Sequence, residues 1–221
     1  MVKVNGKPLL WHTIKRLKQA GYDEIIINVH HFAEQIIKYV EANNFFDIRV
    51  AFSDERKALL NTGGGIKNAS WFFDDDEPLL IHNVDIFTNI DLQEFRNDYL
   101  RNEAMVSMVV SKRDTARYLL FDEDQHLKGW VNKKTGNIKS PLSNFNPSLY
   151  NELAFSGIHM LSPKVFKWMN EYPDKFSIID FYIEMSNRIA IRGWTPDQLQ
   201  MIDVGKHETL GLAEQFLSEL D

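Results

Sequence analysis

The chain has 221 residues, of which 44% are hydrophobic and 25% are charged, as in a folded globular protein with one large core. A formal net charge of −6 argues against nucleic-acid binding, because a surface that binds nucleic acid must be basic enough to neutralise phosphates. With no cysteine, no signal-peptide pattern and no apolar stretch near the ~20 residues that span a bilayer, the chain is expected to be cytoplasmic and to bind no membrane.

In the first half of the chain, helical and strand patterns alternate. Apolar residues at helical spacing predict helices over 8–20, 33–43, 64–72 and 91–101. Runs of apolar and β-branched residues predict strands over 24–29, 47–52 and 78–85. This alternation is typical of βαβ units, and it predicts an α/β fold with a mostly parallel sheet flanked by helices.

The second half of the chain is richer in strands. We expect strands over 105–110 and 153–161, a hairpin of 117–121 and 127–131, and helices that begin after Ser162 and Ser177. An apolar segment at 199–205 and a helical segment close the chain. Because the sequence shows no internal repeat, the simplest interpretation is a single domain over 1–221 with a β-rich hairpin or flap insert at about 112–152.

Two aspartates that follow apolar runs are candidate metal ligands. Asp85 ends the run that begins at Pro78, and Asp203 ends a similar segment late in the chain. A carboxylate just past the carboxyl end of a buried strand lies where open α/β sheets bind their ligands. Each aspartate alone could simply cap the turn that follows it. Together they favour a shared Mg²⁺, which uses one or two carboxylates plus substrate phosphates.

Three successive glycines in the segment Asn61–Gly65 form a candidate nucleotide site. Glycines without a Cβ let a planar or anionic group approach the backbone, and the N-terminus of the helix expected next would favour an anion. The alternative is a flexible turn before that helix. The spacing matches neither a Walker loop nor a dinucleotide-binding fingerprint.

The segment Phe155-Ser156-Gly157 lies within an expected strand and is a candidate sugar site. A glycine inside a strand often marks the close approach of a ligand or of another backbone, and the Ser156 hydroxyl beside it could bind a sugar. A simple β-bulge explains the same glycine equally well.

Taken in order, the segments GKPLL, EIIINVHH, NTGGGI, LLIHNVD, AFSGIHML and IDVG resemble those of the sugar-1-phosphate nucleotidyltransferases over essentially the whole chain. The chain resembles in particular the bacterial branch that contains N-acetylmuramate-1-phosphate uridylyltransferases and mannose-1-phosphate guanylyltransferases. The resemblance implies a Rossmann-like fold of the nucleotide-diphospho-sugar transferase type. It also implies an enzyme of cell-envelope nucleotide-sugar biosynthesis, which forms a nucleoside-diphosphate sugar from a sugar 1-phosphate and a nucleoside triphosphate with Mg²⁺.

The resemblance also implies roles for individual residues. The nucleotide base would lie against Thr62, Gly63, Gly64 and Gly65, the sugar against Phe155, Ser156 and Gly157, and Mg²⁺ between Asp85 and Asp203. This sequence has Asn83-Val84-Asp85 where Gly-Asp is commoner in the family, a departure that keeps the metal ligand in place.

A second departure concerns the start of the chain. The family opens with a buried strand, the signature G-x-G-x-R-x-x-P and then P-K-x-L, whose arginine and lysine neutralise the triphosphate. Met1 falls just after the expected P-K, so these roles pass to neither Lys3 nor Lys7. We therefore expect an N-terminally truncated chain with impaired turnover. The cause would be either a misplaced start codon or a catalytically inactive homologue that binds a nucleotide sugar or regulates a partner.

Loss of the first strand would have a structural consequence. That strand would lie mid-sheet, beside 24–29 and 78–85, so its absence would leave unpaired backbone and an apolar gap. We expect a rearrangement, closure by a neighbouring strand, or pairing with a second chain, which makes a homodimer a candidate assembly.

A different activity, that of a metal-dependent glycosyltransferase of related fold, is the remaining alternative. Such an enzyme would want a D-x-D pair at the end of the strand, and Asn83-Val84-Asp85 supplies only half of it.

Overall fold

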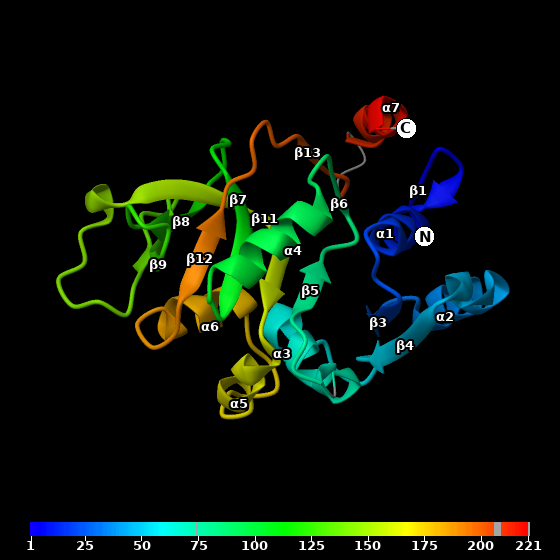
Figure 1. Cartoon of the computed structure of the whole chain (residues 1–221), viewed down its shortest axis with the longest axis horizontal. Coiled ribbons are helices and arrows are strands. Elements are labelled where there is room, and N and C mark those ends of the chain that lie inside the picture. The colour runs from blue at the N-terminus through cyan, green and yellow to red at the C-terminus, as the bar shows by residue number, and fades with distance from the viewer. Residues whose placement is uncertain (74, 206–208, 221) are drawn as a thin grey trace.

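The structure is a computed structural model, and it describes residues 1–73, 75–205 and 209–220. Within these ranges the chain is a mixed α/β protein in which helices cover both faces of a central sheet (Figure 1). The expected α/β class with helices flanking a sheet is confirmed.

The central sheet is built around one long strand, β11 (Asn151–Leu161). The first residues of β11 pair with β8 (Arg117–Phe121), its last residues pair with β5 (Leu79–His82), and β7 (Val106–Ser111) also pairs along it. The sheet continues through β9 (Leu127–Asn132) and β10 (Ile138–Lys139) beyond β8, and through β12 (Ile191–Trp194) beyond β7.

Strand direction differs in one respect from the mostly parallel sheet expected from the sequence. Strands β5 and β7 both run antiparallel to β11, and β12 runs parallel to β7, so β5, β7 and β12 share one direction. Between β5 and β7, however, β11 runs the opposite way, and the β8–β9 hairpin adds further antiparallel pairs. The ladders are therefore mainly antiparallel, because β11 pairs directly with the β8–β9 hairpin, without the crossover helix that a parallel pair requires.

The apolar core lies on both faces of this sheet. Val106, Met108 and Val110 of β7 pack in the cluster that contains α6 (Ile178–Met185). Val109 packs instead in the cluster that contains α4 (Leu92–Arg101). Because successive side chains of a strand point to opposite faces, the apolar run of β7 is buried from both sides.

Two helices begin at caps that the sequence predicts. The Asp91 side chain accepts hydrogen bonds from the backbone N–H groups of Gln93 and Glu94 ahead of α4. The Ser177 hydroxyl accepts one from the Asp180 N–H ahead of α6. The other helices are α1 (Leu9–Gln19), α2 (Ala33–Ala42), α3 (Asn61–Asn68), α5 (Phe166–Met169) and α7 (Leu210–Leu220).

Among the described residues, no helix is both long enough and apolar enough to cross a bilayer.

Three smaller strand pairs lie outside the central sheet. A hairpin of β1 (Lys3–Val4) and β2 (Lys7–Pro8) precedes α1, and β6 (Ile86–Thr88) pairs antiparallel with β13 (Met201–Asp203). The third pair is parallel and joins β3 (Glu24–Val29) to β4 (Arg49–Asp54). In Figure 1 the β3–β4 pair lies beside α2, apart from β5.

The sheet is therefore split between β3 and β5. Within the described residues, β3 pairs only with β4 and β5 pairs only with β11, so each has an open edge. A cavity of about 1390 Å³ lies between them, lined by both strands and by Met1 and Val2. The expected apolar gap is present, and no described strand closes it.

The open edge explains why neither strand is as deeply buried as the sequence suggests. Ile25, Ile26 and Ile27 of β3 remain partly exposed, and so do the last three residues of β5. The sequence predicts that the run ending at Asp85 is buried on both faces. This prediction is wrong for β5, because no strand among the described residues pairs with its free edge.

Candidate functional site

The two predicted metal ligands lie at one point of the structure. A Cβ placed on Gly205 would lie 3.0 Å from Asp203 Oδ1 and 3.4 Å from Asp85 Oδ2. The two carboxylates therefore flank the same small volume, in which a side chain at residue 205 would be tightly packed. Asp85 and Asp203 come from distant parts of the sequence, and the fold brings them together as expected.

Short backbone contacts fix this arrangement. Asp203 pairs with Ile86 across the β6–β13 ladder, one residue beyond Asp85. The Val204 N–H donates to the Asp85 carbonyl oxygen at 2.8 Å, and the Gly205 N–H donates to Asp203 Oδ1 at 2.9 Å. Asp203 thus arrives on a short antiparallel strand rather than at the end of a buried parallel strand.

The electrostatics of the pair suit a cation. Burial raises the pKa of the Asp85 carboxyl, the nearby Asp203 carboxylate raises it further, and a backbone hydrogen bond partly opposes both effects. Within the described residues, no group of three or more His, Cys, Asp or Glu side chains forms a closed metal cage. Two carboxylates with open positions fit Mg²⁺, which keeps several sites for water or phosphate oxygens.

A bulge in β11 lies against Asn83, two residues before Asp85. The ladder between β11 and β7 shifts register between Phe155 and His159. At the bulge, Gly157 has φ +81°, and a Cβ there would lie 2.8 Å from Asn83 Nδ2. The Asn83 N–H donates to the Gly157 carbonyl at 3.1 Å. Glycine is required here both for its positive φ and for the close approach of the 83–85 turn.

The Ser156 hydroxyl does not face an open site. Ser156 is buried, and its Oγ donates to the Val109 carbonyl oxygen at 2.8 Å. Phe155, by contrast, lines the large cavity together with Asn83 and Thr62. Of the three residues expected at the sugar, Phe155 therefore has its side chain on the cavity, while Gly157 shapes the turn next to Asp85.

The glycine run lies inside α3, not in a loop before a helix as expected. Gly63, Gly64 and Gly65 are buried in its first turns. A Cβ on Gly63 would meet the Phe176 ring at 2.3 Å, and one on Gly64 would meet the Asp174 carbonyl oxygen at 2.0 Å. These glycines therefore let α3 pack closely against the protein itself, which the sequence interpretation did not foresee.

Thr62 is the exposed member of the run. It lines the cavity, and its Oγ1 accepts a hydrogen bond from the Ile178 N–H at 3.1 Å, at the start of α6. Thr62 thus joins the first turns of α3 and α6 at the cavity wall. The described contacts do not bring Thr62 against the Asp85–Asp203 pair, although Asn83 belongs to the same cavity.

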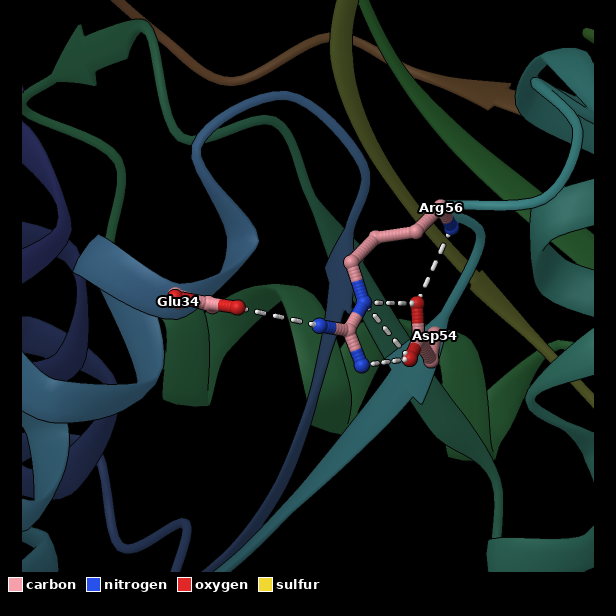
Figure 2. A network of polar contacts seen from close by, with 3 residues as sticks. All are labelled: Glu34, Asp54 and Arg56. Atoms are coloured by element: carbon pink, nitrogen blue, oxygen red, sulfur yellow. Dashed lines mark hydrogen bonds and ion pairs between the residues drawn. The ribbon is translucent and has the colours of Figure 1, made fainter.

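An exposed polar network lies where the chain leaves β4 toward α3 (Figure 2). The Arg56 guanidinium donates to both carboxylate oxygens of Asp54, at distances of 2.6–3.0 Å, and lies 3.8 Å from Glu34 Oε1 on α2. These hydrogen bonds lower the pKa of the Asp54 carboxyl to about 2. The Arg56 side chain is therefore turned toward Asp54, a pairing that no pattern in the sequence indicated.

Several residues that line the cavity carry a buried polar atom without a hydrogen-bond partner within the described residues. These atoms are the Tyr22 hydroxyl, His82 Nε2 and His159 Nδ1. Burial lowers the pKa of His159 to about 3 and that of His82 to about 4, so both imidazoles are neutral near pH 7.

Comparison with known proteins points to one family. The model of the family described as "Nucleotidyl transferase" matches residues 1–218. Among curated proteins, N-acetylmuramate alpha-1-phosphate uridylyltransferase of Neisseria meningitidis is 38% identical over 92 residues, which cover 41% of this chain and 39% of that protein. The corresponding protein of Caulobacter vibrioides is 36% identical over 87 residues, covering 38% and 36% of the two chains. The matched segments thus span less than two fifths of the length of these two relatives.

Solved structures share the fold over a longer range. HddC from Yersinia pseudotuberculosis, complexed with GMP-PN, is 25% identical with a TM-score of 0.75, covering 98% of this chain and 88% of that one. A UDP-glucose pyrophosphorylase complexed with UDP-glucose is 14% identical with a TM-score of 0.73, covering 100% and 90% of the two chains. At that identity the second likeness concerns the fold alone.

Proposed function

Because this chain belongs to the nucleotidyl transferase family, we propose that it takes part in the transfer of a nucleotidyl group from a nucleoside triphosphate to a sugar 1-phosphate. A phosphate oxygen of the sugar 1-phosphate attacks the α-phosphorus, the bond from the α-phosphorus to the bridging oxygen breaks, and pyrophosphate leaves. The product is a nucleoside-diphosphate sugar. The names of the matched relatives, which transfer uridylyl or guanylyl groups to sugar 1-phosphates, support this reaction class.

The observation that carries the proposal is the meeting of Asp85 and Asp203 beside Gly205. Both carboxylates would hold Mg²⁺, which when bound neutralises phosphate charge and orients the in-line displacement. The raised pKa of Asp85 is what two like charges at a partly buried site produce, and a bound cation would reverse it. No general base is needed, since the attacking phosphate oxygen is already ionised near pH 7.

The remaining site residues have more indirect roles in this proposal. Thr62 would contact the nucleotide from the cavity wall, while Gly63, Gly64 and Gly65 hold α3 close enough for Thr62 to do so. Phe155 would border the sugar, Ser156 would anchor the strand beneath it, and Gly157 would keep Asn83 beside Asp85.

We also propose that the slot between β3 and β5 takes one extended apolar segment that precedes Met1 in a longer form of the polypeptide. Two open strand edges face the same cavity, and Met1 and Val2 line it, so such a segment could enter without a long connection. Ile81 and His82 both line the cavity, and because successive side chains of a strand point to opposite faces, the cavity reaches both faces of β5. Solved neighbours also contain additional chain, since this chain covers only 88% and 90% of two of them.

The segment would complete the sheet and bring the basic triphosphate loop that residues 1–221 lack. Loss of a single preorganised donor lowers a rate by roughly 10²–10³-fold, so residues 1–221 alone should turn over very slowly. A cytoplasmic location, a role in cell-envelope precursor supply and a homodimer remain parts of this proposal. The first rests on the composition, the second on the family resemblance and the third on the open strand edges.

The test is product analysis with two forms of the protein. Residues 1–221, and a form extended by the upstream reading frame, are incubated with Mg²⁺, each nucleoside triphosphate, and glucose, mannose or N-acetylmuramate 1-phosphate. We expect pyrophosphate and a nucleoside-diphosphate sugar from the extended form, at least ~100-fold faster than from residues 1–221. Release of a nucleoside diphosphate without pyrophosphate would instead identify a glycosyltransferase. A stop codon directly upstream of Met1 would contradict the slot proposal and favour an inactive homologue.

A further inference from the structure

A buried carboxylate, Glu55, joins three elements at the base of the glycine helix. Glu55 follows β4 and is only 6% exposed. Its backbone N–H donates to the Val29 carbonyl at 2.8 Å, which extends the β3–β4 ladder by one bond. Its side chain then turns inward, while the neighbouring Arg56 points outward to Asp54 (Figure 2).

Both carboxylate oxygens of Glu55 accept hydrogen bonds from neutral donors. Oε1 accepts from Asn28 Nδ2 of β3 at 3.0 Å, and Oε2 accepts from the backbone N–H of Leu60 at 3.1 Å. Leu60 is the residue that precedes α3. One side chain therefore ties the end of β3 to the first turn of the glycine helix.

The same pair explains the third glycine of the run. A Cβ on Gly65 would lie 2.5 Å from Asn28 Nδ2 and 2.7 Å from Glu55 Oε1. Only glycine leaves room for the Asn28–Glu55 pair against α3. Asn28, Glu55 and Gly65, which lie in three separate segments of the sequence, therefore all take part in one contact.

Glu55 has no ion-pair partner within the described residues. A carboxylate that is buried without a cation opposes folding unless its hydrogen bonds offset the lost hydration. An apolar side chain of similar size would fill this position without that penalty. The presence of a carboxylate therefore indicates a geometric requirement rather than simple packing.

We propose that Glu55, acting with Asn28, is a positioning residue for the nucleotide. Glu55 fixes the N-terminal turn of α3, and α3 places Thr62 on the cavity wall that also includes Asn28. Glu55 itself touches no reacting atom. This inference rests on the proposed function, because the ligand it positions is the nucleoside triphosphate.

Exchanging the donor and the acceptor of the Asn28–Glu55 hydrogen bond tests this proposal. In Asn28→Asp, two carboxylates would face each other about 3 Å apart, so they repel unless one of them takes up a proton. In Glu55→Gln, the Asn28 amide can turn over and present its oxygen, so we expect a mild effect. In the double variant Asn28→Asp/Glu55→Gln, the new carboxylate at position 28 accepts a hydrogen bond from the new amide at position 55. The oxygen of that amide still accepts from the Leu60 N–H, so both bonds return.

The experiment measures the dissociation constant of each nucleoside triphosphate with Mg²⁺, and amide hydrogen exchange over 60–66, in residues 1–221. We expect Asn28→Asp to weaken binding at least ~tenfold and to speed exchange, and the double variant to lie within ~threefold of the wild type. Glu34→Gln, an exposed carboxylate 3.8 Å from Arg56, is the control and should change neither quantity.

The following results would overturn the inference that Glu55 positions the nucleotide. If Asn28→Asp binds nucleotide as tightly as the wild type, or if the double variant is no better than Asn28→Asp, Glu55 does not position the nucleotide. If exchange over 60–66 changes while binding does not, the pair is only structural, and the inference is also overturned. If neither residues 1–221 nor the form extended by the upstream reading frame binds any triphosphate as the wild type, the proposed function fails first and this inference fails with it.

Discussion

Asp85 and Asp203 illustrate at the residue scale how a candidate binding site opposes the stability of the fold that carries it. Their carboxylates approach one point beside Gly205, and burial of Asp85 adds to their mutual repulsion. A protein without ligand gains nothing from this arrangement. In the proposed function, a bound cation would neutralise the pair.

The first prediction follows from the raised pKa of Asp85. The protonated form is favoured in the folded state, so the contribution of this group to stability is present below its ordinary pKa and is lost as pH rises through the raised value. Asp85→Asn removes the charge and keeps the shape. We expect its melting temperature at pH 7, without divalent cation, to equal or exceed that of the wild type, and its Mn²⁺ affinity to fall at least ~tenfold.

Thermal melts and calorimetric Mn²⁺ titration measure these two quantities. Asp197→Asn, an exposed aspartate far along the chain from Asp85, should change neither of them. A variant Asp85→Asn that melts lower and still binds Mn²⁺ normally would show that Asp85 is a structural cap.

The second prediction concerns His159, which is 2% exposed and has a pKa lowered to about 3 by burial. Between this value and the ordinary pKa near 6.5, the unfolded chain binds more protons than the folded one, so stability rises with pH across that window and is lost on acidification. His159→Leu should flatten the fall in the denaturant midpoint between pH 7 and pH 5.

His82, with a pKa of about 4, should account for part of the slope that remains. His31→Gln, which removes one imidazole at an exposed position, is the control variant. An identical slope in His159→Leu would mean that His159 is protonated, or reached by water, within the folded protein.

At the element scale, α3 shows why a run of three glycines can be a packing device. Glycine in a helix interior is unfavourable by about 1 kcal/mol relative to alanine, and α3 contains three in succession. Each glycine is matched to a different neighbour, namely the Phe176 ring, the Asp174 carbonyl and the Asn28–Glu55 pair. The packing that these close approaches allow outweighs the low helix propensity of the three glycines.

The third prediction compares two glycine substitutions in helices. In Gly64→Ala the new Cβ would lie 2.0 Å from a backbone carbonyl oxygen, which cannot move without the chain around Asp174. We expect the free energy of unfolding to fall by about 3 kcal/mol. Gly211→Ala in α7 meets nothing within 4 Å, so it should leave stability unchanged or raise it by up to about 1 kcal/mol.

Urea denaturation of both variants provides the measurement. Equal effects of the two substitutions would mean that helix propensity, and not the close contact, decides the tolerance of α3.

At the scale of the whole molecule, the split sheet divides the protein into parts of unequal burial. β7 is almost fully buried, and it lies between β11 and β12. β3 pairs with β4 on one side and faces the cavity of about 1390 Å³ on the other. Segments with open edges and few buried contacts unfold locally before the core does.

The fourth prediction is that the two regions differ in amide hydrogen exchange. We expect amides of 25–27 and 80–82 to exchange at least ~100-fold faster than those of 106–110 in residues 1–221. In a form that carries the preceding segment, the difference should shrink, because the slot would be filled and both edges paired. Equal protection in residues 1–221 would contradict the open slot.

Much of this protein is determined by local pattern. The caps at Asp91 and Ser177, the strand over 24–29 and the hairpin of 117–121 and 127–131 follow from propensity and spacing, and the structure contains them. The aspartates and glycines of interest were also recognisable, because those residue types stand out at the ends of apolar runs.

The tertiary structure decided how these parts are used. Only the fold shows that the glycines of α3 are packed against other segments and that Ser156 Oγ donates to the Val109 carbonyl oxygen. Only the fold shows, too, that Glu55 accepts a hydrogen bond from the Leu60 N–H at the start of α3. The sequence held a signal for Gly205 and Asn83, each two residues from a predicted ligand, but none for the bulge of β11 at Gly157 that approaches Asn83. Hydrophobic periodicity encodes which face of an element is buried. Close approaches between elements far apart in the chain depend on their packing angles, which no local pattern specifies.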